Sequence, residues 1–227
     1  MLKKLLFGAM MLFTTAASAQ HSGPAADVDP KAASPVAEQL SLADQLVRYG
    51  YQTKTAMPLI QAVQIYKALN VTAATDDASK TTDGTPAASA SLTKTDVISY
   101  DEAKILDDAT KFADGNKNLL ALIADAKKAT RGAVGGPIYR VDRVEARTTD
   151  IWRINFRGGE DAIVYVSGDG DTDLDLYVYD ENGNLIDSDT DGTDECICTF
   201  HPRWTGPFMI KIKNLGYVYN RYVLRTN

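Results

Sequence analysis

The residues with the clearest potential for chemistry are aspartates in one acidic stretch of the chain. Residues 158–202 hold 13 of the 30 acidic residues and contain no Lys or Arg. Within this stretch, Asp-x-Asp segments precede and follow a turn at 180–184. Carboxylate oxygens are the ligands that Ca²⁺ prefers in proteins. The candidate metal ligands are Asp171, Asp173, Asp175, Asp189 and Asp191.

The turn predicts how these aspartates face each other. The segment 180–184 suits a type I turn followed by a glycine in the left-handed conformation. This turn sets Asp175 opposite Asp189 and, one pair further, Asp173 opposite Asp191. A two-residue Asn-Gly loop would instead turn the aspartates of the second strand toward the apolar face, and the hydrophobic pattern disfavours that register.

Like charges directly opposite on a sheet are destabilising, which leaves two interpretations of this hairpin. Either Ca²⁺ binds the carboxylates, or the hairpin is a solvated acidic edge that prevents pairing between sheets. An EF-hand is excluded, although Asp187-x-Asp189-x-Asp191-Gly192 begins like one. The twelfth position is Cys198 instead of Glu, and predicted strands flank the segment instead of helices.

Signals for other chemistry are few. The chain has two histidines and no nucleophile elbow, zinc-protease helix or phosphate-binding loop. The rival hypothesis to a binding protein is an enzyme with an acid-based site between two parts of the chain, and its candidate acids are Asp101, Glu102, Asp107 and Asp108. A net charge of −6 argues against a nucleic-acid partner.

Two cysteines lie two residues apart, at Cys196 and Cys198. They point to the same face if that segment is extended, and an oxidising compartment favours a disulfide between them. Ring closure over such a short span is strained unless the strand bends, so free thiols are the alternative.

The N-terminus reads as an export signal. Lys3 and Lys4 precede an apolar run, and Ala17-Ser18-Ala19 matches a small-x-small cleavage site. We therefore expect a signal peptide over 1–19, a flexible leader over 20–36, and an exported bacterial protein, periplasmic or secreted. No later stretch is apolar enough for a transmembrane anchor after cleavage.

Two kinds of periodicity then divide the mature chain. Apolar residues at helical spacing predict a helical region over 37–131, built as two hairpins around a disordered loop at about 71–96. Pro58 suits the first turn of the second helix, and Ser99 with Glu102 forms a capping-box signature for the third.

From about residue 137 the apolar period changes to two, which is typical of strands. The expected strands are 138–145, 150–157, 161–167, 173–180, 184–190, 195–200, 207–214 and 219–226. Short strands with Gly, Asn and Pro between them indicate an antiparallel β-sandwich or jelly roll over 137–227. The predicted fold class is α+β in two parts, helical first.

The acidic stretch also resembles a known family. Residues 168–180 read GDGDTDLDLYVYD and are followed by Asn182-Gly183, and a later strand reads WTGPF at 204–208 and then Ile210-Lys-Ile212. Over about 138–227 the chain resembles the bacterial pre-peptidase C-terminal domain. The resemblance implies a secreted β-sandwich with an accessory, non-catalytic role in binding, solubility or secretion, sometimes with calcium. No peptidase lies upstream in this chain, and residues 38–130 resemble no family that we can name.

These observations predict an exported, non-catalytic protein with a β-sandwich that binds a ligand or stabilises the chain and that binds Ca²⁺. The expected partner is an unknown protein or polysaccharide of the envelope or exterior. The alternatives are the envelope enzyme named above and a structural envelope protein that assembles through sheet edges.

Overall fold

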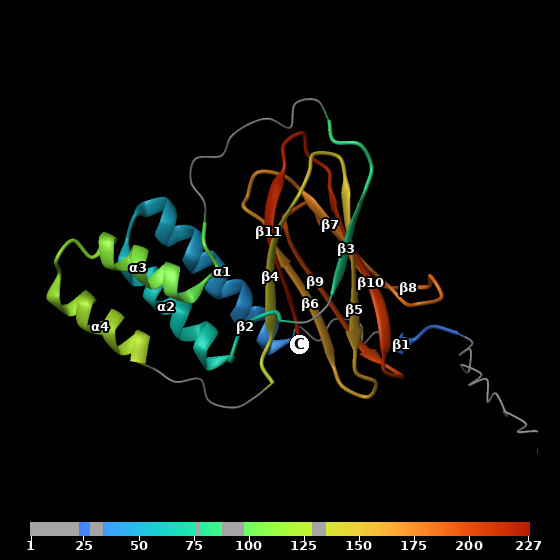
Figure 1. The fold of residues 1–227 in the computed structure, drawn as a ribbon, viewed down its shortest axis with the longest axis horizontal. Helices are drawn as coiled ribbons and strands as arrows, with labels where there is room; N and C mark the ends of the chain where they lie inside the picture. The colour runs from blue at the N-terminus through green and yellow to red at the C-terminus, as the bar shows by residue number, and fades with distance from the viewer. Residues whose placement is uncertain (1–22, 28–33, 76–77, 88–97, 129–134) are drawn as a thin grey trace, which may run out of the picture.

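The helical and the strand periodicities belong to two parts of the molecule that lie side by side (Figure 1). The structure, a computed structural model, describes residues 23–27, 34–75, 78–87, 98–128 and 135–227. The predicted signal peptide lies outside these ranges. Within them the chain forms a helical part and two β-sheets, which confirms the α+β fold class.

The helical part consists of two hairpins in the described residues. They are α1 (Pro35–Thr53) with α2 (Ala56–Ala68), and α3 (Glu102–Phe112) with α4 (Lys117–Lys128). Both predicted hairpins are confirmed. Helix α2 contacts the three other helices, and apolar residues at helical spacing, such as Leu40, Leu59 and Ile105, are buried between them.

The start of α3 differs from the prediction. Its N-cap is Asp101 rather than Ser99, and the Asp101 carboxylate accepts a hydrogen bond from the Lys104 N–H at 2.8 Å. The Ser99 hydroxyl accepts instead from the Asp101 N–H at 3.2 Å. Aspartate and serine are similarly good N-caps, so the local sequence allowed either start.

The C-terminal part is a sandwich of two sheets with orders β1-β9-β6-β11-β4-β2 and β3-β5-β10-β7-β8. Its main strands are β4 (Ile138–Val144), β5 (Thr149–Phe156), β6 (Ala162–Ser167), β7 (Leu174–Tyr179), β8 (Leu185–Asp189), β9 (Glu195–Pro202), β10 (Gly206–Asn214) and β11 (Asn220–Thr226). These are the eight expected strands, each shifted by a few residues at most. The predicted antiparallel sandwich is confirmed.

Three further strands come from segments that were not expected to form any. They are β1 (Ala26–Asp27) beside β9, β2 (Thr72–Ala73) beside β4, and β3 (Ser79–Asp83) beside β5. The structure thus differs from the predicted leader (20–36) and disordered loop (71–96) at these positions. The added strands are short or polar and pair through their backbones, so they carry no period-two apolar signal.

The helices cover the outer face of the six-stranded sheet (Figure 1). Along β6, Val164 and Val166 face the interior of the sandwich, whereas Ile163 and Tyr165 pack against the helical core. All six residues of β6 are buried as a result. A strand that is covered on both faces reads as a continuous apolar run, as this one does.

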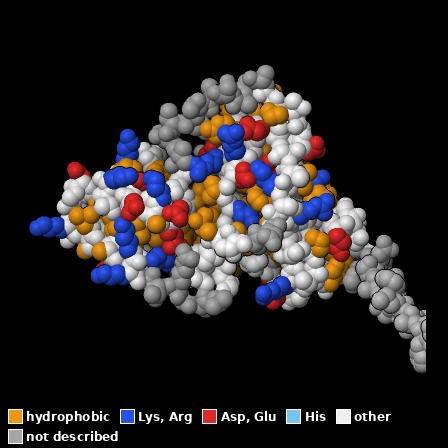
Figure 2. Space-filling view, viewed as in Figure 1, with side chains coloured by type: hydrophobic (Ala, Val, Ile, Leu, Met, Phe, Trp, Pro, Cys, Tyr) orange, Lys and Arg blue, Asp and Glu red, His pale blue; other side chains and the backbone are white. Residues whose placement is uncertain are grey.

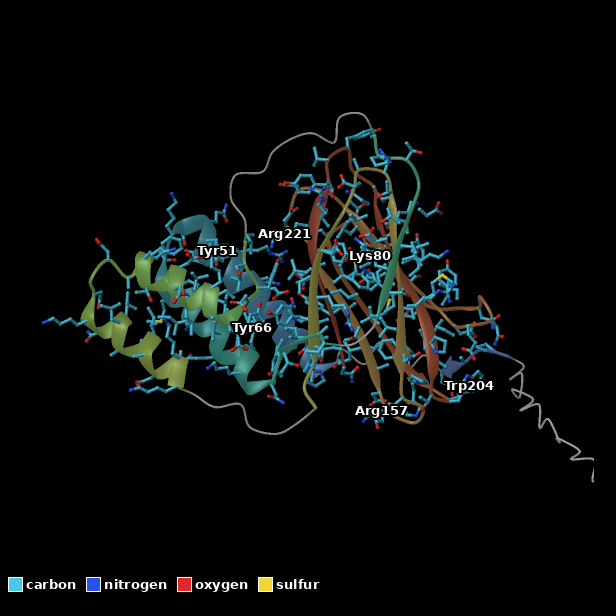
Figure 3. All side chains as sticks on the ribbon, viewed as in Figure 1. Tyr51, Tyr66, Lys80, Arg157, Trp204 and Arg221 are labelled. Carbon is cyan, nitrogen blue, oxygen red and sulfur yellow. The ribbon has the colours of Figure 1, made fainter. Side chains whose placement is uncertain are left out.

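A buried ion pair connects the two parts. The Arg225 guanidinium on β11 donates to the Asp44 carboxylate on α1, and both side chains are at most 1% exposed. Tyr66 of α2 also donates to Asp44, and the rings of Tyr66, Tyr100 and Tyr165 lie 4.9, 5.5 and 5.8 Å from the guanidinium. Figure 3 places Tyr66 at this junction.

The described helices also bear on membrane insertion. In the part of the chain that the structure describes, none of them is both long and apolar enough to cross a bilayer.

Candidate functional site

The acidic hairpin β7–β8 has the expected turn but not the expected register. At its tip the Asp180 N–H donates to the Asn184 carbonyl at 3.0 Å, and Gly183 has φ of +82°. A bulge beside Tyr179 then shifts the pairing, so that Leu176 lies opposite Asp189. The predicted pairing of Asp175 with Asp189 is therefore wrong.

The same bulge turns two aspartates of β8 toward the other sheet. The Asp189 carboxylate accepts from the Ile197 N–H at 2.8 Å, and the Asp187 carboxylate accepts from the Thr199 N–H at 3.1 Å. These N–H groups lie on the edge of β9 that faces away from β6. Because half-buried backbone donors must be satisfied, the carboxylates cap the strand edge, and this need overrides the hydrophobic pattern.

The predicted pairing of Asp173 with Asp191 is also not formed. Asp173 precedes β7, and Leu174 at its start donates its N–H to the Thr193 carbonyl at 3.0 Å. Asp191 lies beyond β8, and its carboxylate accepts from the Thr193 N–H at 2.9 Å. Asp171 is exposed in the preceding loop.

Four carboxylates nevertheless lie near one another at this end of the sandwich, and we call them the acidic group: Asp173, Asp175, Asp191 and Asp194. Burial raises the pKa of Asp173, and the charges of the other three raise it further. The Asp173 Oδ1 atom is buried and has no hydrogen-bond partner in the described structure. Asp194 was missed from the sequence, although it lies in the same acidic stretch.

The acidic group is not a preformed metal site. Across the described ranges, no three His, Cys, Asp or Glu side chains are arranged so that they could hold one metal ion. Asp175 is buried and accepts a hydrogen bond from the Tyr177 hydroxyl at 3.1 Å. Its side chain and that of Asp189 belong to opposite faces of the sheet, because Asp189 faces Leu176.

The predicted disulfide is wrong, because Cys196 and Cys198 are free thiols. Strand β9 stays regular along β6, so residues two apart are separated by about 6.6 Å, whereas a disulfide needs Cβ atoms about 3.8 Å apart. Both thiols are buried in the sandwich core, and Cys196 Sγ donates to the Leu174 carbonyl at 3.1 Å. Burial, and then nearby aspartates, raise the pKa of each thiol.

A second candidate site lies where the helices meet the sandwich. This junction pocket has a volume of about 670 Å³ and is bounded by α1, α3 and the loop that follows β6. Its lining includes Arg48, Tyr51, Gln52, Asp108, Phe112 and Asp169. Figure 3 shows Tyr51 on the helical side of the junction and Arg221 on the sandwich side.

The acids considered for an enzyme at this junction already have partners. Asp101 caps α3, and Asp107 pairs with Lys127 at 2.8 Å. Asp108 pairs with Lys111 at 2.7 Å and also with Lys104, and it accepts from the Tyr51 hydroxyl at 3.1 Å. Glu102 lies in the first turn of α3 and is half-buried.

The protonation of Asp108 follows from these contacts. Burial alone would raise its pKa, but the hydrogen bonds from Lys104, Lys111 and Tyr51 outweigh burial and lower it. A carboxyl with a lowered pKa stays ionised near neutral pH. It is poorly suited to act as a general acid.

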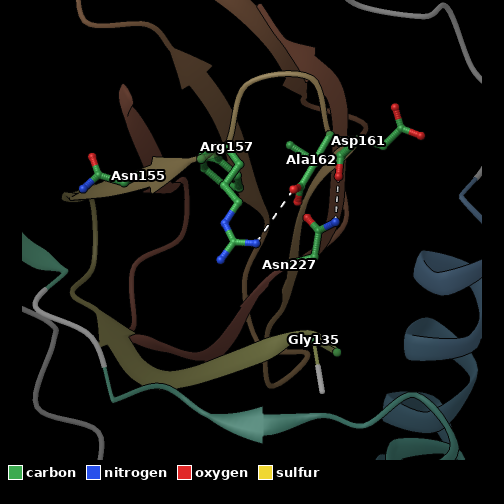
Figure 4. A pocket seen from close by; sticks show the side chains of 9 residues that line it. Gly135, Asn155, Arg157, Asp161, Ala162 and Asn227 are labelled. Carbon is green, nitrogen blue, oxygen red and sulfur yellow. Dashed lines mark hydrogen bonds and ion pairs between the residues drawn. The ribbon is translucent and has the colours of Figure 1, made fainter. Parts of the chain in front are cut away.

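A smaller pocket, of about 280 Å³, lies at the end of the sandwich near Asn227 (Figure 4). The Asn227 amide donates to the Asp161 carbonyl at 2.7 Å and accepts from the Ile163 N–H at 2.8 Å. Arg157 lies 3.8 Å from Glu160. The Asn227 side chain in the pocket lining is thus engaged within the protein.

No protein-family model and no curated protein matches the chain. Among solved structures, a mitogen derived from Yersinia pseudotuberculosis shares 12% identity with a TM-score of 0.35, covering 41% of this chain and 86% of its own. The pre-peptidase C-terminal domain of a collagenase from Bacillus anthracis shares 13% identity with a TM-score of 0.32, covering 40% and 87%. The latter belongs to the family that residues 168–183 resemble. Both likenesses concern the fold alone and carry no argument about function.

Proposed function

We propose that this is an exported, non-catalytic protein that binds an envelope or extracellular ligand. The observation that carries the proposal is the state of the acids at the junction of its two parts. Asp107 and Asp108 are held in ion pairs with lysines, and Asp101 caps a helix. The lysines lower the pKa of Asp107 and Asp108, which suits neither to act as a general acid, whereas the pocket beside Asp108 has room for a small molecule.

The test measures what happens to a captured ligand. The full mature chain is immobilised and incubated with soluble protein and glycan fractions of a bacterial envelope, and the captured molecules are identified by mass before and after prolonged incubation. We expect molecules that are recovered unchanged. Release of cleaved or otherwise modified products, at a rate that depends on Asp108, would support the rival enzyme and contradict the proposal.

Export is tested separately, since it rests on residues 1–19 alone. We expect the chain expressed in a bacterium to be recovered outside the cytoplasm with Gln20 as its first residue, which intact mass would show. Recovery of cytoplasmic protein that retains residues 1–19 would contradict this part of the proposal.

We further propose that Ca²⁺ draws the carboxylates of the acidic group together, since they do not form a metal site as they stand in the described structure, and so stabilises the sandwich. The supporting observation is Asp173, whose Oδ1 is buried and lacks a hydrogen-bond partner in the described structure, and whose pKa is raised by burial and three neighbouring carboxylates. The donors proposed from the sequence also included Asp171 and Asp189. Because Asp189 caps β9, the proposal now centres on Asp173, Asp175 and Asp191, with Asp194 beside them.

A further inference from the structure

We propose that the junction pocket binds a neutral saccharide. This inference rests on the proposed binding function and names a ligand class for it. The pocket lies between the helical part and the sandwich, and sites for small ligands occur preferentially at such boundaries. Its volume of about 670 Å³ falls within the usual range for ligand pockets.

The lining carries two cations, Arg48 and Lys54, and two anions, Asp108 and Asp169, and this balance of charge favours an uncharged ligand. Arg48 is held by Glu195 at 3.2 Å and by Asp194 at 3.8 Å. On the opposite side, Asp108 is held by Lys111 and Lys104. A charged ligand would have to compete with these ion pairs, and breaking a partly buried pair is unfavourable. In the face that Figure 2 draws, acidic and basic side chains are interspersed over the helical part.

The remaining lining suits both the apolar C–H faces and the hydroxyl groups of a sugar. Tyr51 and Phe112 form an edge-to-face pair with ring centroids 6.2 Å apart, and Ile98 adds to this apolar wall. Aromatic surface of this kind packs against the C–H faces of a sugar ring. Gln52 and Lys54 line the same pocket with exposed side chains, and the Gln52 amide can both donate to and accept from hydroxyl groups.

The two sides of the pocket are held in a fixed relation. Arg48 on α1 donates to the Ser167 hydroxyl at 3.3 Å and to the Gly168 carbonyl at 3.1 Å, directly before the loop that supplies Gly170 to the lining. Its own helix carries Tyr51 and Gln52. The same guanidinium therefore fixes the distance between the walls, which reduces the ordering cost of binding.

The test uses the full mature chain and three trisaccharides that differ in charge. They are neutral tri-N-acetylglucosamine, cationic triglucosamine and anionic trigalacturonate. Affinities are measured by titration calorimetry, and the site is located by ¹H–¹⁵N shifts. We expect the neutral sugar to bind more tightly than either charged one and to shift the amides of both Gln52 and Gly170.

Two variants that preserve the fold test the lining. Phe112→Leu keeps apolar bulk but removes the aromatic face, and should weaken binding roughly 2- to 12-fold. Gln52→Ala removes one exposed amide and should weaken binding about fivefold. The control Gln61→Ala changes an exposed glutamine on α2, outside the lining, and should bind as wild type does.

Three results would overturn the inference: no binding of the neutral sugar, tighter binding of a charged sugar, or shifts confined to the outer face of the five-stranded sheet near Tyr177. Each of these leaves the proposed binding function intact. Cleavage of the trisaccharide during the titration would instead contradict the non-catalytic function, so the two failures are distinguishable.

Discussion

The carboxylate of Asp180 ties the β7–β8 turn to the segment before β1. Its Oδ1 accepts from the N–H groups of Asn182 and Asn184 at 2.9 and 2.8 Å. Its Oδ2 accepts from the Ala25 N–H at 3.0 Å and from the Asn184 side-chain amide at 2.9 Å. Burial alone would raise its pKa, but these hydrogen bonds outweigh burial and lower it. The residue thus fixes the β7–β8 turn and anchors the segment that leads into β1.

We expect Asp180→Asn to destabilise the protein by about 2 kcal/mol at pH 7, because an amide cannot accept all four hydrogen bonds. A carboxyl whose pKa is lowered on folding contributes stability above its unfolded pKa of about 3.9 and loses it as pH falls through the folded pKa. The difference between wild type and variant should therefore shrink on going from pH 7 toward pH 2. Urea unfolding at several pH values measures it.

The control for this prediction is Asp83→Asn, which changes an exposed aspartate of β3. It should leave stability within about 0.5 kcal/mol of wild type. If the difference in free energy of unfolding between wild type and Asp180→Asn stays constant down to pH 2, the charge of Asp180 is not the cause of its stabilising effect.

Asp173 provides the second prediction at this scale. Its pKa is raised on folding, so the folded state holds the proton of this carboxyl more tightly than the unfolded chain does. The free energy of unfolding therefore falls as pH rises from the unfolded pKa of about 3.9 through the folded pKa. We expect Ca²⁺ at 100 times its dissociation constant to add roughly 2.7 kcal/mol, and Mg²⁺ to add less. Thermal unfolding with each ion and with chelator measures this gain.

Asp173→Asn should melt above wild type in chelator and gain less than wild type from Ca²⁺. Glu160→Gln, in an exposed turn at 158–160, should behave as wild type in both conditions. If wild type melts at the same temperature with Ca²⁺ and with chelator, the acidic group is a solvated edge and the calcium proposal fails.

Among the secondary-structure elements, predictability follows how each strand is buried. Strands β4–β11 bury one or both faces, so apolar periodicity located them. Strand β3 runs along the edge as Ser-Lys-Thr-Thr-Asp and is mostly exposed, so it left no such signal. The register of β8 was missed for another reason: Asp189 and Asp187 accept hydrogen bonds from N–H groups on β9, and apolar periodicity carries no signal of this contact or of the one-residue bulge.

The geometry of β9 yields a prediction about its thiols. Native mature protein treated with iodoacetamide should show no modified cysteine, because Cys196 and Cys198 are buried and burial raises the pKa of each thiol. The same treatment in guanidinium without reductant should modify both. Intact mass reports the number of adducts, and no adduct after denaturation would demonstrate the disulfide that the extended strand disfavours.

For the molecule as a whole, the ion pair that connects the helices to the sandwich could not be predicted from the sequence. Asp44 and Arg225 are 181 positions apart, and each could be taken for a solvated charge on an amphipathic element. The structure buries both between α1 and the six-stranded sheet, beside three tyrosine rings. A buried charge is tolerated there only because its counter-charge and hydrogen bonds accompany it.

This ion pair predicts that the two parts unfold together. Asp44→Asn leaves the Arg225 guanidinium buried beside a neutral amide and should cost about 3–5 kcal/mol. We expect wild type to unfold in one transition. The variant should either unfold in one transition at lower denaturant or show separate transitions for the helices and the sandwich. Far-UV circular dichroism and the fluorescence of the two tryptophans, Trp152 and Trp204 of the sandwich, would distinguish these outcomes.

A double-mutant cycle separates the ion pair from the packing around it. Asp44→Leu alone and Arg225→Met alone each leave one buried charge without its counter-charge and should be strongly destabilising, whereas the double variant removes both charges and should recover most of the loss of stability. Coupling of about 2 kcal/mol or more would establish that the pair acts as a unit. If the two losses simply add, the helices are held on the sheet by apolar contacts such as those of Ile163 and Tyr165 instead.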